Sequence, residues 1–399
     1  MGFPRRLLGL PLAVALALGV TACGGDDDKA APSADAQGCV ESYDAATDYF
    51  PVKQKLEHAT NFTLTYARNY QVLTVKQPSP GAKPQTYVLV RCGTPEPALT
   101  GELEGAVAVE TPVRSLFSAS TTHLPFLADL GVLDVLKGVS SAAYVTSPDV
   151  IERVQSGAVA EYASGQEIDV EKVVGAAPDV LVTDGTENPG YQPLREAGVD
   201  VLANAEWLES SPLGRAEWVK FFAALTGSEA KADQVFTKVA ADYRTLADKV
   251  KNAEPTTVLP GTMYSGQWSI PNGGSYVGSL IKDAGGTYAW ADTAGTGSTT
   301  LDLEAVLAKA EDASTWLVVE NGWTKLADAE KADARYAKFK AFQTGDVWSA
   351  NKVLGPGGGN DYWERGVARP DLILADLVAI LHPDLSPGHA FTFYRKLAA

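Results

Sequence analysis

Three short runs near the amino end of the chain alternate apolar and polar residues or are rich in β-branched residues. They cover residues 62–66, 70–75 and 87–91. Asn69 separates the first two runs, and a segment rich in Pro, over residues 77–84, precedes the third. Alternation with a period of two is typical of strands that bury one face. The pattern therefore predicts a small, β-rich antiparallel meander within residues 39–110.

From about residue 111 the pattern changes to apolar strands that alternate with amphipathic helices. The predicted strands cover residues 113–118, 180–182 and 199–202, and the predicted helices cover 123–130, 148–157 and 191–198. Ser147 and Pro148 are suited to the start of a helix, and Gly157 to its end. Continuous apolar strands between helices are typical of a parallel sheet that is covered on both faces. We therefore predict an α/β lobe over residues 111–227.

A long helix and a second α/β series follow. Residues 228–252 contain no Gly, and their apolar residues are spaced three or four apart throughout. This pattern predicts a single helix about 37 Å long. Later predicted strands cover residues 256–259, 316–320 and 347–349, and later predicted helices cover 275–284 and 372–381. The predicted fold class is α/β, with two doubly wound lobes, residues 111–227 and 253–399, joined by this rigid helix.

Composition narrows the range of partners. The chain has 399 residues, of which 33 are Lys or Arg and 49 are Asp or Glu, so its formal net charge is −16. Apolar residues make up 45% of the chain, enough for several packed domains. A protein that neutralises phosphates needs a surplus of Lys and Arg on some face. We therefore expect no nucleic-acid partner.

The amino terminus carries an export signal. Arg5 and Arg6 precede an apolar run over residues 7–20, which is shorter than the roughly 20 residues of a membrane span. Small residues then lead to Cys23, and this arrangement resembles the lipobox of bacterial lipoproteins. The resemblance implies a signal peptide over residues 1–22 and lipidation of Cys23. An ordinary signal peptide with a coincidental Cys is the alternative, and the sequence leaves Sec and Tat export both open.

Residues 23–38 are polar, acidic and without periodicity, so we expect a flexible tether. The lipobox resemblance places the folded part outside the cytoplasm, held to the cell membrane through the N-terminal lipid alone. In that oxidising location Cys39 and Cys92, which bracket the predicted meander, can form a disulfide; two free thiols are the alternative. The extension over residues 39–110 is interpreted as a brace on the first lobe or as a partner-binding module.

An acidic motif occurs once in each predicted lobe. Asp169 and Glu171 begin one predicted helix, and Asp302 and Glu304 begin another, each about ten residues before an apolar strand. Asp at an N-cap and Glu in the first turn both favour helix formation, so a capping role alone is one interpretation. A capping-box Glu stands three residues after the cap, however, and these stand two after it. The repeat therefore also indicates two symmetric surface features.

The whole pattern resembles the substrate-binding proteins of ABC importers for ferric siderophores, cobalamin and haem, the class III periplasmic binding proteins. The resemblance covers about residues 113–383, and the paired acidic motifs, the bridging helix and the Arg369-Pro370-Asp371 segment contribute to it. It implies that Glu171 and Glu304 dock on Arg residues of an ABC permease dimer, which works with a cytoplasmic ATPase. It also implies that the lobes close little on the ligand. The extension over residues 39–110 is not part of the usual family core.

The ligand site is predicted at the carboxyl ends of the parallel strands, between the lobes. Loop aromatic and polar residues at these ends are typical of recognition, although each of them can instead belong to ordinary packing. The candidates are Ser120, Thr122, His123, Tyr144, Asp184 and Trp207 in the first lobe, and Tyr264, Trp268, Trp323, Tyr362, Trp363 and Arg365 in the second. Flat rings suit a chelate or tetrapyrrole face, and Arg365 can pair with an anionic complex.

The ligand class stays open among three kinds of molecule. A bare metal ion needs several converging His and carboxylate ligands, and of the four His only His123 is placed near the predicted cleft. We therefore expect no protein-bound metal and no cofactor, and a ligand that already contains chelated iron, an iron-siderophore. A corrinoid or haem is the alternative, as is a surface receptor without a transport role. No motif of a hydrolase or metalloprotease is present, so we expect no catalytic residues.

Overall fold

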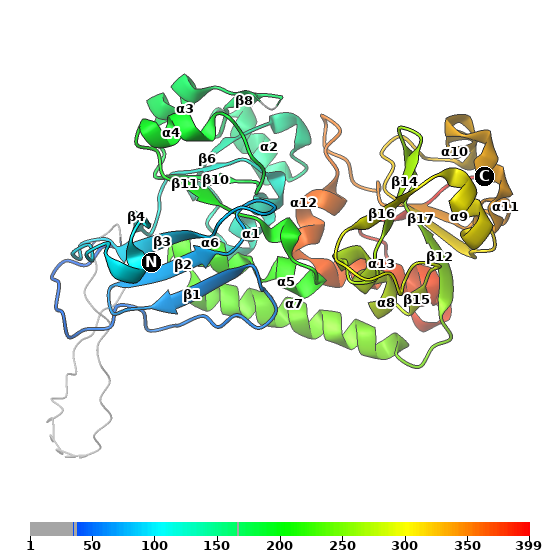
Figure 1. The fold of residues 1–399 in the computed structure, drawn as a ribbon, viewed down its shortest axis with the longest axis horizontal. Coiled ribbons are helices and arrows are strands. Elements are labelled where there is room, and N and C mark those ends of the chain that lie inside the picture. The colour runs from blue at the N-terminus through cyan, green and yellow to red at the C-terminus, as the bar shows by residue number, and fades with distance from the viewer. Residues whose placement is uncertain (1–34, 36–37, 166) are drawn as a thin grey trace, which may run out of the picture.

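The computed structural model describes residue 35 and residues 38–399 apart from residue 166. The predicted signal peptide, the lipidation site Cys23 and nearly all of the predicted tether lie outside the described residues. Two lobes stand side by side above one long helix, α7 (Glu229–Val250), and a β-sheet extension flanks the first lobe (Figure 1). The arrangement confirms the predicted two-lobed α/β fold with its bridging helix.

The extension is a four-stranded sheet of order β1-β2-β3-β4. Its strands are β1 (Phe62–Tyr66), β2 (Tyr70–Val75), β3 (Gln85–Arg91) and β4 (Val107–Thr111). The first three form the predicted antiparallel meander, with Leu64 opposite Leu73 and Val72 opposite Val88. The fourth strand, which the sequence analysis did not find, runs parallel to β3. It carries the chain directly into the first lobe.

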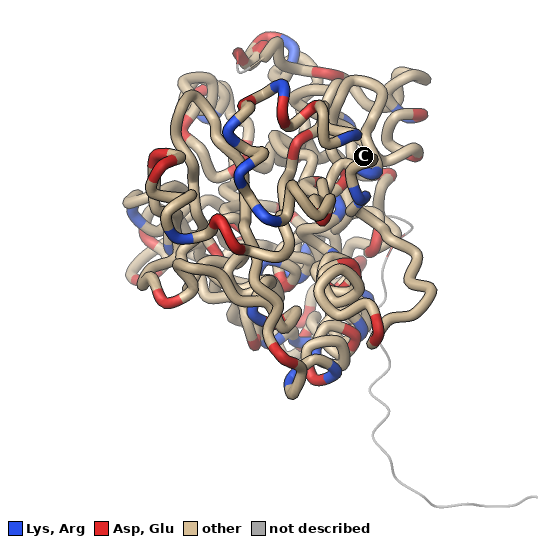
Figure 2. Tube along the Cα trace, turned by 90° about the vertical axis from the view of Figure 1, so that its right-hand side faces the viewer, with Lys and Arg blue, Asp and Glu red and all other residues tan. Residues whose placement is uncertain are grey.

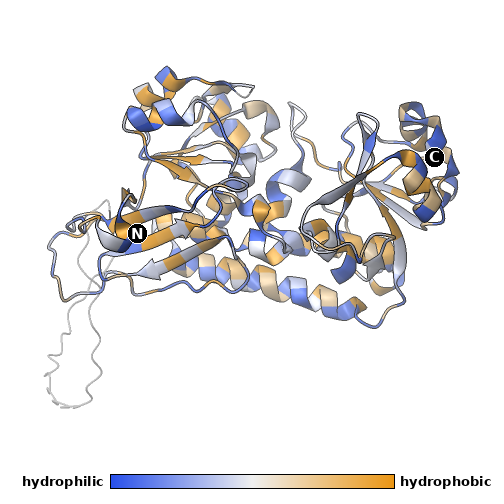
Figure 3. Ribbon diagram, in the orientation of Figure 1, coloured by the Kyte–Doolittle hydropathy of each residue, from blue (hydrophilic) through white to orange (hydrophobic). Residues whose placement is uncertain are grey.

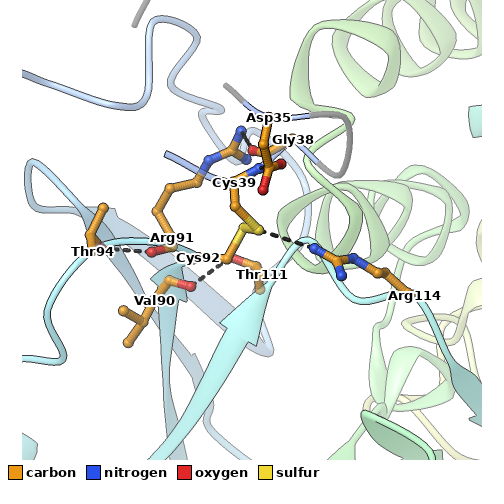
Figure 4. The surroundings of a disulfide bond; sticks show 9 residues. All are labelled: Asp35, Gly38, Cys39, Val90, Arg91, Cys92, Thr94, Thr111 and Arg114. Carbon is orange, nitrogen blue, oxygen red and sulfur yellow. Dashed lines mark hydrogen bonds between the residues drawn. A yellow bond between two sulfur atoms is a disulfide. The ribbon is translucent and has the colours of Figure 1, made fainter. Parts of the chain in front are cut away.

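A disulfide closes the extension. Cys39 is bonded to Cys92, 53 residues later in the sequence, immediately after β3 (Figure 4). The Arg91 guanidinium donates to the Gly38 carbonyl oxygen at 2.7 Å, and Arg114 Nη2 lies 3.0 Å from Cys39 Sγ. The predicted pairing is therefore confirmed. It fixes the residues around Cys39 against the end of β3, an inner strand of the sheet.

The first lobe, here called the N-lobe, contains a parallel five-stranded sheet of order β11-β10-β5-β6-β7. These strands are β5 (Leu116–Ser118), β6 (Leu136–Val139), β7 (Ala160–Glu161), β10 (Val180–Thr183) and β11 (Val201–Ala203). Its helices are α1 (Leu124–Leu130), α2 (Pro148–Gln155), α3 (Val170–Ala176), α4 (Tyr191–Glu196), α5 (Pro212–Ala216) and α6 (Val219–Thr226). In Figure 1, α3 and α4 lie above the sheet and α1 and α6 below it. A small hairpin, β8 (Ala163–Ser164) and β9 (Glu167–Ile168), precedes α3.

The second lobe, the C-lobe, repeats the plan with a five-stranded sheet of order β15-β12-β17-β18-β19, parallel except for β19. These strands are β12 (Thr256–Pro260), β15 (Gly286–Thr287), β17 (Thr315–Val318), β18 (Val347–Ser349) and β19 (Arg395–Lys396). A second, antiparallel sheet contains β13 (Met263–Tyr264), β14 (Gln267–Pro271) and β16 (Ser298–Leu301). The helices are α8 (Tyr276–Asp283), α9 (Leu303–Ala310), α10 (Leu326–Ala332), α11 (Lys340–Gln343), α12 (Asp361–Ala368) and α13 (Pro370–Leu381).

Two helices, α7 below the lobes and α12 between them, contact both lobes. Helix α7 packs against α6 of the N-lobe and α13 of the C-lobe. Helix α12 contacts α13 of the C-lobe and also α1 and α5 of the N-lobe, and it lies between the lobes in Figure 1. One cluster of buried apolar side chains runs from Phe62 in the extension through Trp218 to Trp316 in the C-lobe. This continuity makes the two lobes and the extension one packed body.

Two buried carboxylates fasten the extension to the N-lobe. Glu217 accepts backbone N–H bonds from Glu57, His58 and Ala59 at 2.6–3.0 Å. Its carboxylate also makes a buried ion pair with Lys220 at 2.7 Å. Similarly, Glu209 accepts the backbone N–H groups of residues 60 and 61 at 2.8–2.9 Å. Hydrogen bonds to a charged acceptor are stronger than neutral ones. The extension is thus an integral brace of the N-lobe.

Hydropathy differs between the lobe sheets and the bridging helix, and charges of both signs are mixed on the surface. The central strands β10 and β17 of the two lobe sheets are mainly apolar, whereas α7 alternates apolar and polar residues along its length (Figure 3). Figure 2, which faces the C-lobe side, shows Lys and Arg interspersed with Asp and Glu. Among the residues that the structure describes, no helix is both long and apolar enough to cross a membrane.

Candidate ligand-binding cleft

A cavity of about 290 Å³ lies at the carboxyl ends of the N-lobe strands. The loops that follow β5, β6 and β10 form its floor, and the hairpin of β8 and β9 borders it. Its polar lining consists of Ser140, Tyr162, Asp184, Thr186, Glu187, Asn188 and Tyr191. The cavity therefore lies where the parallel-sheet rule places ligands.

Two buried tyrosines and one carboxylate form the centre of this N-lobe cavity. Tyr191 Oη lies 3.5 Å from Asp184 Oδ1, which also accepts bonds from the Thr186 backbone N–H and hydroxyl. Burial raises the pKa of Tyr162 and of Tyr191 well above the ordinary value, and the nearby Asp184 charge adds to both shifts. Both phenols therefore stay protonated at neutral pH. Sequence analysis found Asp184 but missed both tyrosines.

The C-lobe has its own cavity of about 280 Å³ at the carboxyl ends of β12 and β17. It is mainly apolar, and its lining includes Pro260, Pro271, Val277, Leu280, Ile281, Leu317, Val319, Tyr362, Trp363 and Tyr394. None of the described residues that line it is charged. Burial raises the pKa of Tyr362 and Tyr394, so these rings are neutral as well. The two lobes thus offer chemically different surfaces.

A glycine-rich strap crosses from the C-lobe onto the N-lobe. Residues 355–359 lie so close to residues 143–145, which follow β6, that a Cβ atom at Gly357 or Gly359 would collide with a backbone carbonyl there. Only Gly permits such an approach between two backbones. Asn321, just beyond β17, holds the strap from the C-lobe side by donating to the Gly358 carbonyl oxygen at 2.9 Å.

Helix α12 strengthens this junction between the lobes. Glu364 accepts the backbone N–H groups of Thr146 at 2.7 Å and Ser147 at 2.9 Å, and Thr146 Oγ1 donates to Asp361 at 3.0 Å. Burial raises the pKa of Glu364 to about 7, the two N–H donors oppose the shift, and the Asp361 charge adds to it. Glu364 therefore joins the lobes through a carboxyl group that titrates near neutrality.

Beneath the strap, a buried ion pair meets a tyrosine of the C-lobe. Arg215 Nη2 lies 2.7 Å from Glu206 Oε2, and both side chains are buried. The same guanidinium lies over the ring of Tyr276, 4.4 Å from its centroid. Tyr276 in turn hydrogen-bonds to Tyr362. This chain of contacts fixes the floor of the cleft across both lobes.

The structure places the twelve predicted ligand residues in four kinds of position. Asp184, Tyr362 and Trp363 line the lobe cavities. Four residues do not line a described cavity but are partly or largely exposed: Tyr144 at 62%, Trp207 at 41% and Tyr264 at 84%, with Arg365 half-exposed. Trp207 Nε1 donates to the Asp184 carbonyl oxygen at 3.0 Å, so it supports the loop of the N-lobe cavity. Ser120 and Thr122 are half-buried and hydrogen-bond to each other at 2.9 Å.

Three predicted ligand residues are core residues instead. His123 is buried, its Nδ1 lies 2.8 Å from Ser118 Oγ, and desolvation lowers the pKa of its imidazole to about 3. Trp268 is fully buried and stacks on Trp316. Trp323 packs edge-on against the same Trp316 ring. Their placement in the cleft was wrong. Strand β14 pairs with β16 and places the Trp268 ring in the C-lobe core, Trp323 packs into the same ring cluster, and His123 packs against Phe222 in the N-lobe.

Arg365 is not free to meet an anionic ligand. Its guanidinium makes a 2.6 Å ion pair with Asp361, one turn earlier in α12, and lies over the ring of Phe393. A charge that is already paired offers much less to an incoming anion. The interpretation of Arg365 as an anion partner is therefore not supported by its surroundings.

The paired acidic motifs begin helices in equivalent positions of the two lobes. Asp169 caps α3 by accepting the Lys172 N–H at 2.9 Å, and Asp302 caps α9 by accepting the Ala305 N–H at 2.7 Å. Glu171 and Glu304 both stand in the first turn and are exposed. Within the described part of the chain Glu171 has no ion pair, whereas Glu304 Oε1 lies 2.8 Å from Arg335, which also pairs with Asp333.

A third cavity, of about 610 Å³, lies between the extension and the N-lobe. Residues 78–85 form one side, and the loop over residues 186–195 with its helix forms the other. Ser79 Oγ donates to Glu187 Oε1 at 2.8 Å across it. Since the loop also borders the N-lobe cavity, the extension supports that cavity from behind.

Among the described residues, no group of three or more His, Cys, Asp or Glu side chains is arranged to hold a metal ion.

Residues 118–354, more than half of the chain, match the periplasmic binding protein family. The chain belongs to this family. Periplasmic binding proteins of this class are the solute-binding proteins of ABC transporters, and the two lobes over a long helix are their class III fold.

Similar proteins include lipoproteins and solved periplasmic binding proteins. An uncharacterized lipoprotein of Methanocaldococcus jannaschii is 29% identical over 329 residues, which cover 78% of this chain and 76% of that protein. A periplasmic haem-binding protein from Pseudomonas aeruginosa has a TM-score of 0.56 at 19% identity and covers 72% of this chain and 99% of its own. A possible iron-binding periplasmic protein from Staphylococcus epidermidis has a TM-score of 0.54 at 16% identity, covering 68% and 99%. These structures share the fold of this periplasmic binding protein.

Proposed function

We propose that this periplasmic binding protein is a lipid-anchored extracytoplasmic receptor. In this proposal it captures a ferric siderophore in the cleft between its lobes and delivers it to an ABC importer permease, which is driven by a cytoplasmic ATPase. Lipidation at Cys23 would hold it to the cell membrane. The likeness to lipoproteins supports the anchor.

The matched pair of Glu171 and Glu304 carries the transport proposal. Both carboxylates are exposed in the first turns of capped helices, one on each lobe, and α7 and the strap fix the lobes to one another. Two charges held on a rigid body restrict the orientations in which both can meet cationic sockets. Such complementarity favours a fast, salt-sensitive and transient dock, which suits a receptor that must release its ligand to a permease.

The lining of the two lobe cavities supports the proposal that the ligand already contains its metal ion. A chelated iron needs no protein ligands, and the cleft supplies apolar rings and neutral hydroxyls rather than a cluster of His and carboxylate groups. The aromatic C-lobe cavity also suits the flat face of a corrinoid or haem, which is the alternative ligand class. The protein itself would need no cofactor and perform no catalysis.

Ligand binding is tested with a panel of ferric siderophores, haemin and cobalamin. Trp363 lines the C-lobe cavity, so a coloured ligand there should quench its fluorescence. Trp363→Phe should lose most of this quenching, whereas Trp268→Phe, in the core, should keep it. A panel without quenching and without a thermal shift would contradict both ligand classes.

Docking is tested in cells that depend on this receptor for uptake. Glu171→Lys combined with Glu304→Lys should abolish uptake and leave ligand affinity in solution unchanged, because both side chains are exposed and outside the cavities. The matched control, Glu196→Lys with Glu330→Lys, makes the same charge change at other exposed positions of the two lobes. Normal uptake by the docking double variant would contradict the importer role and favour a receptor without transport.

A further inference from the structure

The charges around the N-lobe cavity all have one sign. Asp184 and Glu187 are the charged residues among its described lining, and no Lys or Arg is found there. Their hydrogen-bond partners are neutral: Thr186 and Tyr191 for Asp184, and Ser79 for Glu187. The negative charge of the cavity is therefore not cancelled by an ion pair with any described residue.

Tyr162 contributes an unused hydrogen-bonding group to this cavity. Its side chain is 1% exposed, and its hydroxyl has no hydrogen-bond partner among the described residues. The ring stacks on Phe117, with centroids 5.3 Å apart, so the side chain is held in place. An unsatisfied buried hydroxyl costs about 1–3 kcal/mol. A ligand that bonds to Tyr162 would recover this cost.

Cations elsewhere in the cleft cannot offset this charge. Arg215 is buried against Glu206, and Arg365 is paired with Asp361. Neither residue lines the N-lobe cavity. An anionic ligand group entering the cavity would meet Asp184 and no cation in the described lining; Arg195 of α4 lies outside it, in the lining of the neighbouring cavity with Glu187 and Tyr191. Like charges in a partly buried site repel strongly. An uncharged or cationic group meets no such barrier.

We propose that the N-lobe cavity is a specificity subsite for an uncharged or cationic hydrogen-bonding group of the ligand, such as a hydroxamate, amide or amine, and that it excludes anionic groups. Asp184 sets the charge preference, and Tyr162 supplies the hydrogen bond. The apolar C-lobe cavity takes the remaining face of the ligand. This inference rests on the proposed capture of a chelate or tetrapyrrole and names the chemical class within it: hydroxamate-type rather than catecholate-type complexes.

The test compares ligands of different charge by calorimetry on the full folded chain. The probes are a ferric trihydroxamate with a free amine, an uncharged ferric trihydroxamate, an anionic ferric triscatecholate, a cationic corrinoid and anionic haemin. In each ligand class the wild type should bind the anionic member most weakly. Asp184→Asn should weaken the cationic members about tenfold, leave the uncharged trihydroxamate within about twofold, and strengthen the anionic members.

A second variant tests the hydroxyl. Tyr162→Phe keeps the ring on Phe117 and removes only the unpaired oxygen, so the fold should be unaffected or slightly more stable. Binding of the hydroxamates should fall about five- to tenfold, at the magnitude of one neutral hydrogen bond. Glu196→Gln, on α4 but outside the cavity, is the matched control and should change neither affinity nor charge preference.

The outcomes separate this inference from the proposed function. If the triscatecholate or haemin binds as tightly as the cationic members, or if Asp184→Asn leaves the order unchanged, the subsite is wrong although the receptor function stands. If Tyr162→Phe binds every hydroxamate as the wild type does, the hydrogen bond is wrong. If no probe binds to any variant, the proposed function fails and the subsite fails with it.

Discussion

The two lobes share one plan, but the N-lobe carries an added sheet that is attached in part by buried polar contacts. In the N-lobe, the buried carboxylates Glu209 and Glu217 fix an added sheet in place, and a disulfide closes a loop within that sheet's own segment. Both lobes also contain a cluster of packed rings, which includes Trp218 and Phe221 in the N-lobe and Trp268 and Trp316 in the C-lobe. Hydrogen bonds are directional, so they suit the attachment of a foreign sheet in one register, whereas ring packing suits a lobe that folds on itself. The cavities differ in the same way, polar in one lobe and apolar in the other.

The aromatic side of this comparison predicts the largest effect. Trp316→Ala removes a fully buried ring and the hydrogen bond from its Nε1 to the Gly261 carbonyl oxygen, 2.7 Å away. We expect a loss of about 5 kcal/mol in the free energy of unfolding, measured by urea titration. Trp363→Ala, a half-exposed ring, is the control and should cost far less. Equal losses would mean that the cluster does not hold the C-lobe.

The covalent part of the N-lobe comes next. Replacement of Cys39 and Cys92 by Ser opens a loop of 53 residues, and the lost chain constraint should cost about 4 kcal/mol. Reduction of the wild type should lower its urea midpoint to that of the double variant. The midpoint of the double variant should not change with reductant. An unchanged midpoint would show that the carboxylates alone suffice to attach the extension.

The polar part is tested by Glu217→Gln. The amide cannot accept all the N–H groups of residues 57–59, and it leaves the buried ammonium of Lys220 without its partner. We expect a loss of about 3 kcal/mol in the urea titration. Adding Lys220→Met should restore part of the stability, because no buried charge then remains unpaired. Without any restoration, the hydrogen bonds rather than the ion pair would carry the effect.

The junction between the lobes should respond to pH. The pKa of Glu364 is about 7 in the folded protein, above its ordinary value of 4.5, so the folded state keeps a proton that the unfolded state loses. Stability from this group therefore falls as pH rises from about 4.5 to 7. Melting temperatures across this range should decline more steeply for the wild type than for Glu364→Gln. Parallel curves would contradict the raised pKa.

The smallest effect concerns the exposed carboxylates. Arg335→Ala removes the partner of Glu304 and makes it resemble Glu171, which has no ion pair in the described part of the chain. Because exposed ion pairs contribute little, the melting temperature should stay within measurement error. Uptake should then depend on salt as strongly as before. A marked fall in stability would show that this pair is structural and that the two docking positions are not equivalent.

Periodicity predicted the architecture closely. The meander strands, α7 and both acidic helix starts lie at or within two residues of the expected bounds, because alternation and capping are local properties of the sequence. The parallel pairing of β4 with β3 was missed, since Val107–Thr111 gains its partner only through tertiary contact. The contacts of α12 with the N-lobe were not predicted for the same reason, because Glu364 bonds to Thr146, 218 residues earlier in the chain.

The candidate site was predicted less well than the fold. Asp184, Tyr362 and Trp363 were found because they follow strands or stand in a conspicuous loop. A position in a predicted loop does not reveal where the side chain points, so Trp268 and Trp323 were mistaken for cleft residues. Tyr162 was missed for the opposite reason: it lies between two very short strands, and an unpaired hydroxyl leaves no mark in the sequence.

The attachment of the extension also determines an order of events in time. Residues 57–61 are made early, but the carboxylates that accept their N–H groups stand 148–160 positions further along the chain. A chain that emerges from its amino end cannot complete these bonds until residue 217 is available, and contacts so distant in sequence form slowly. Cys39 and Cys92, only 53 residues apart, are both present well before then. The extension therefore completes its folding only after residues up to 217 have been made, well after its own disulfide can form.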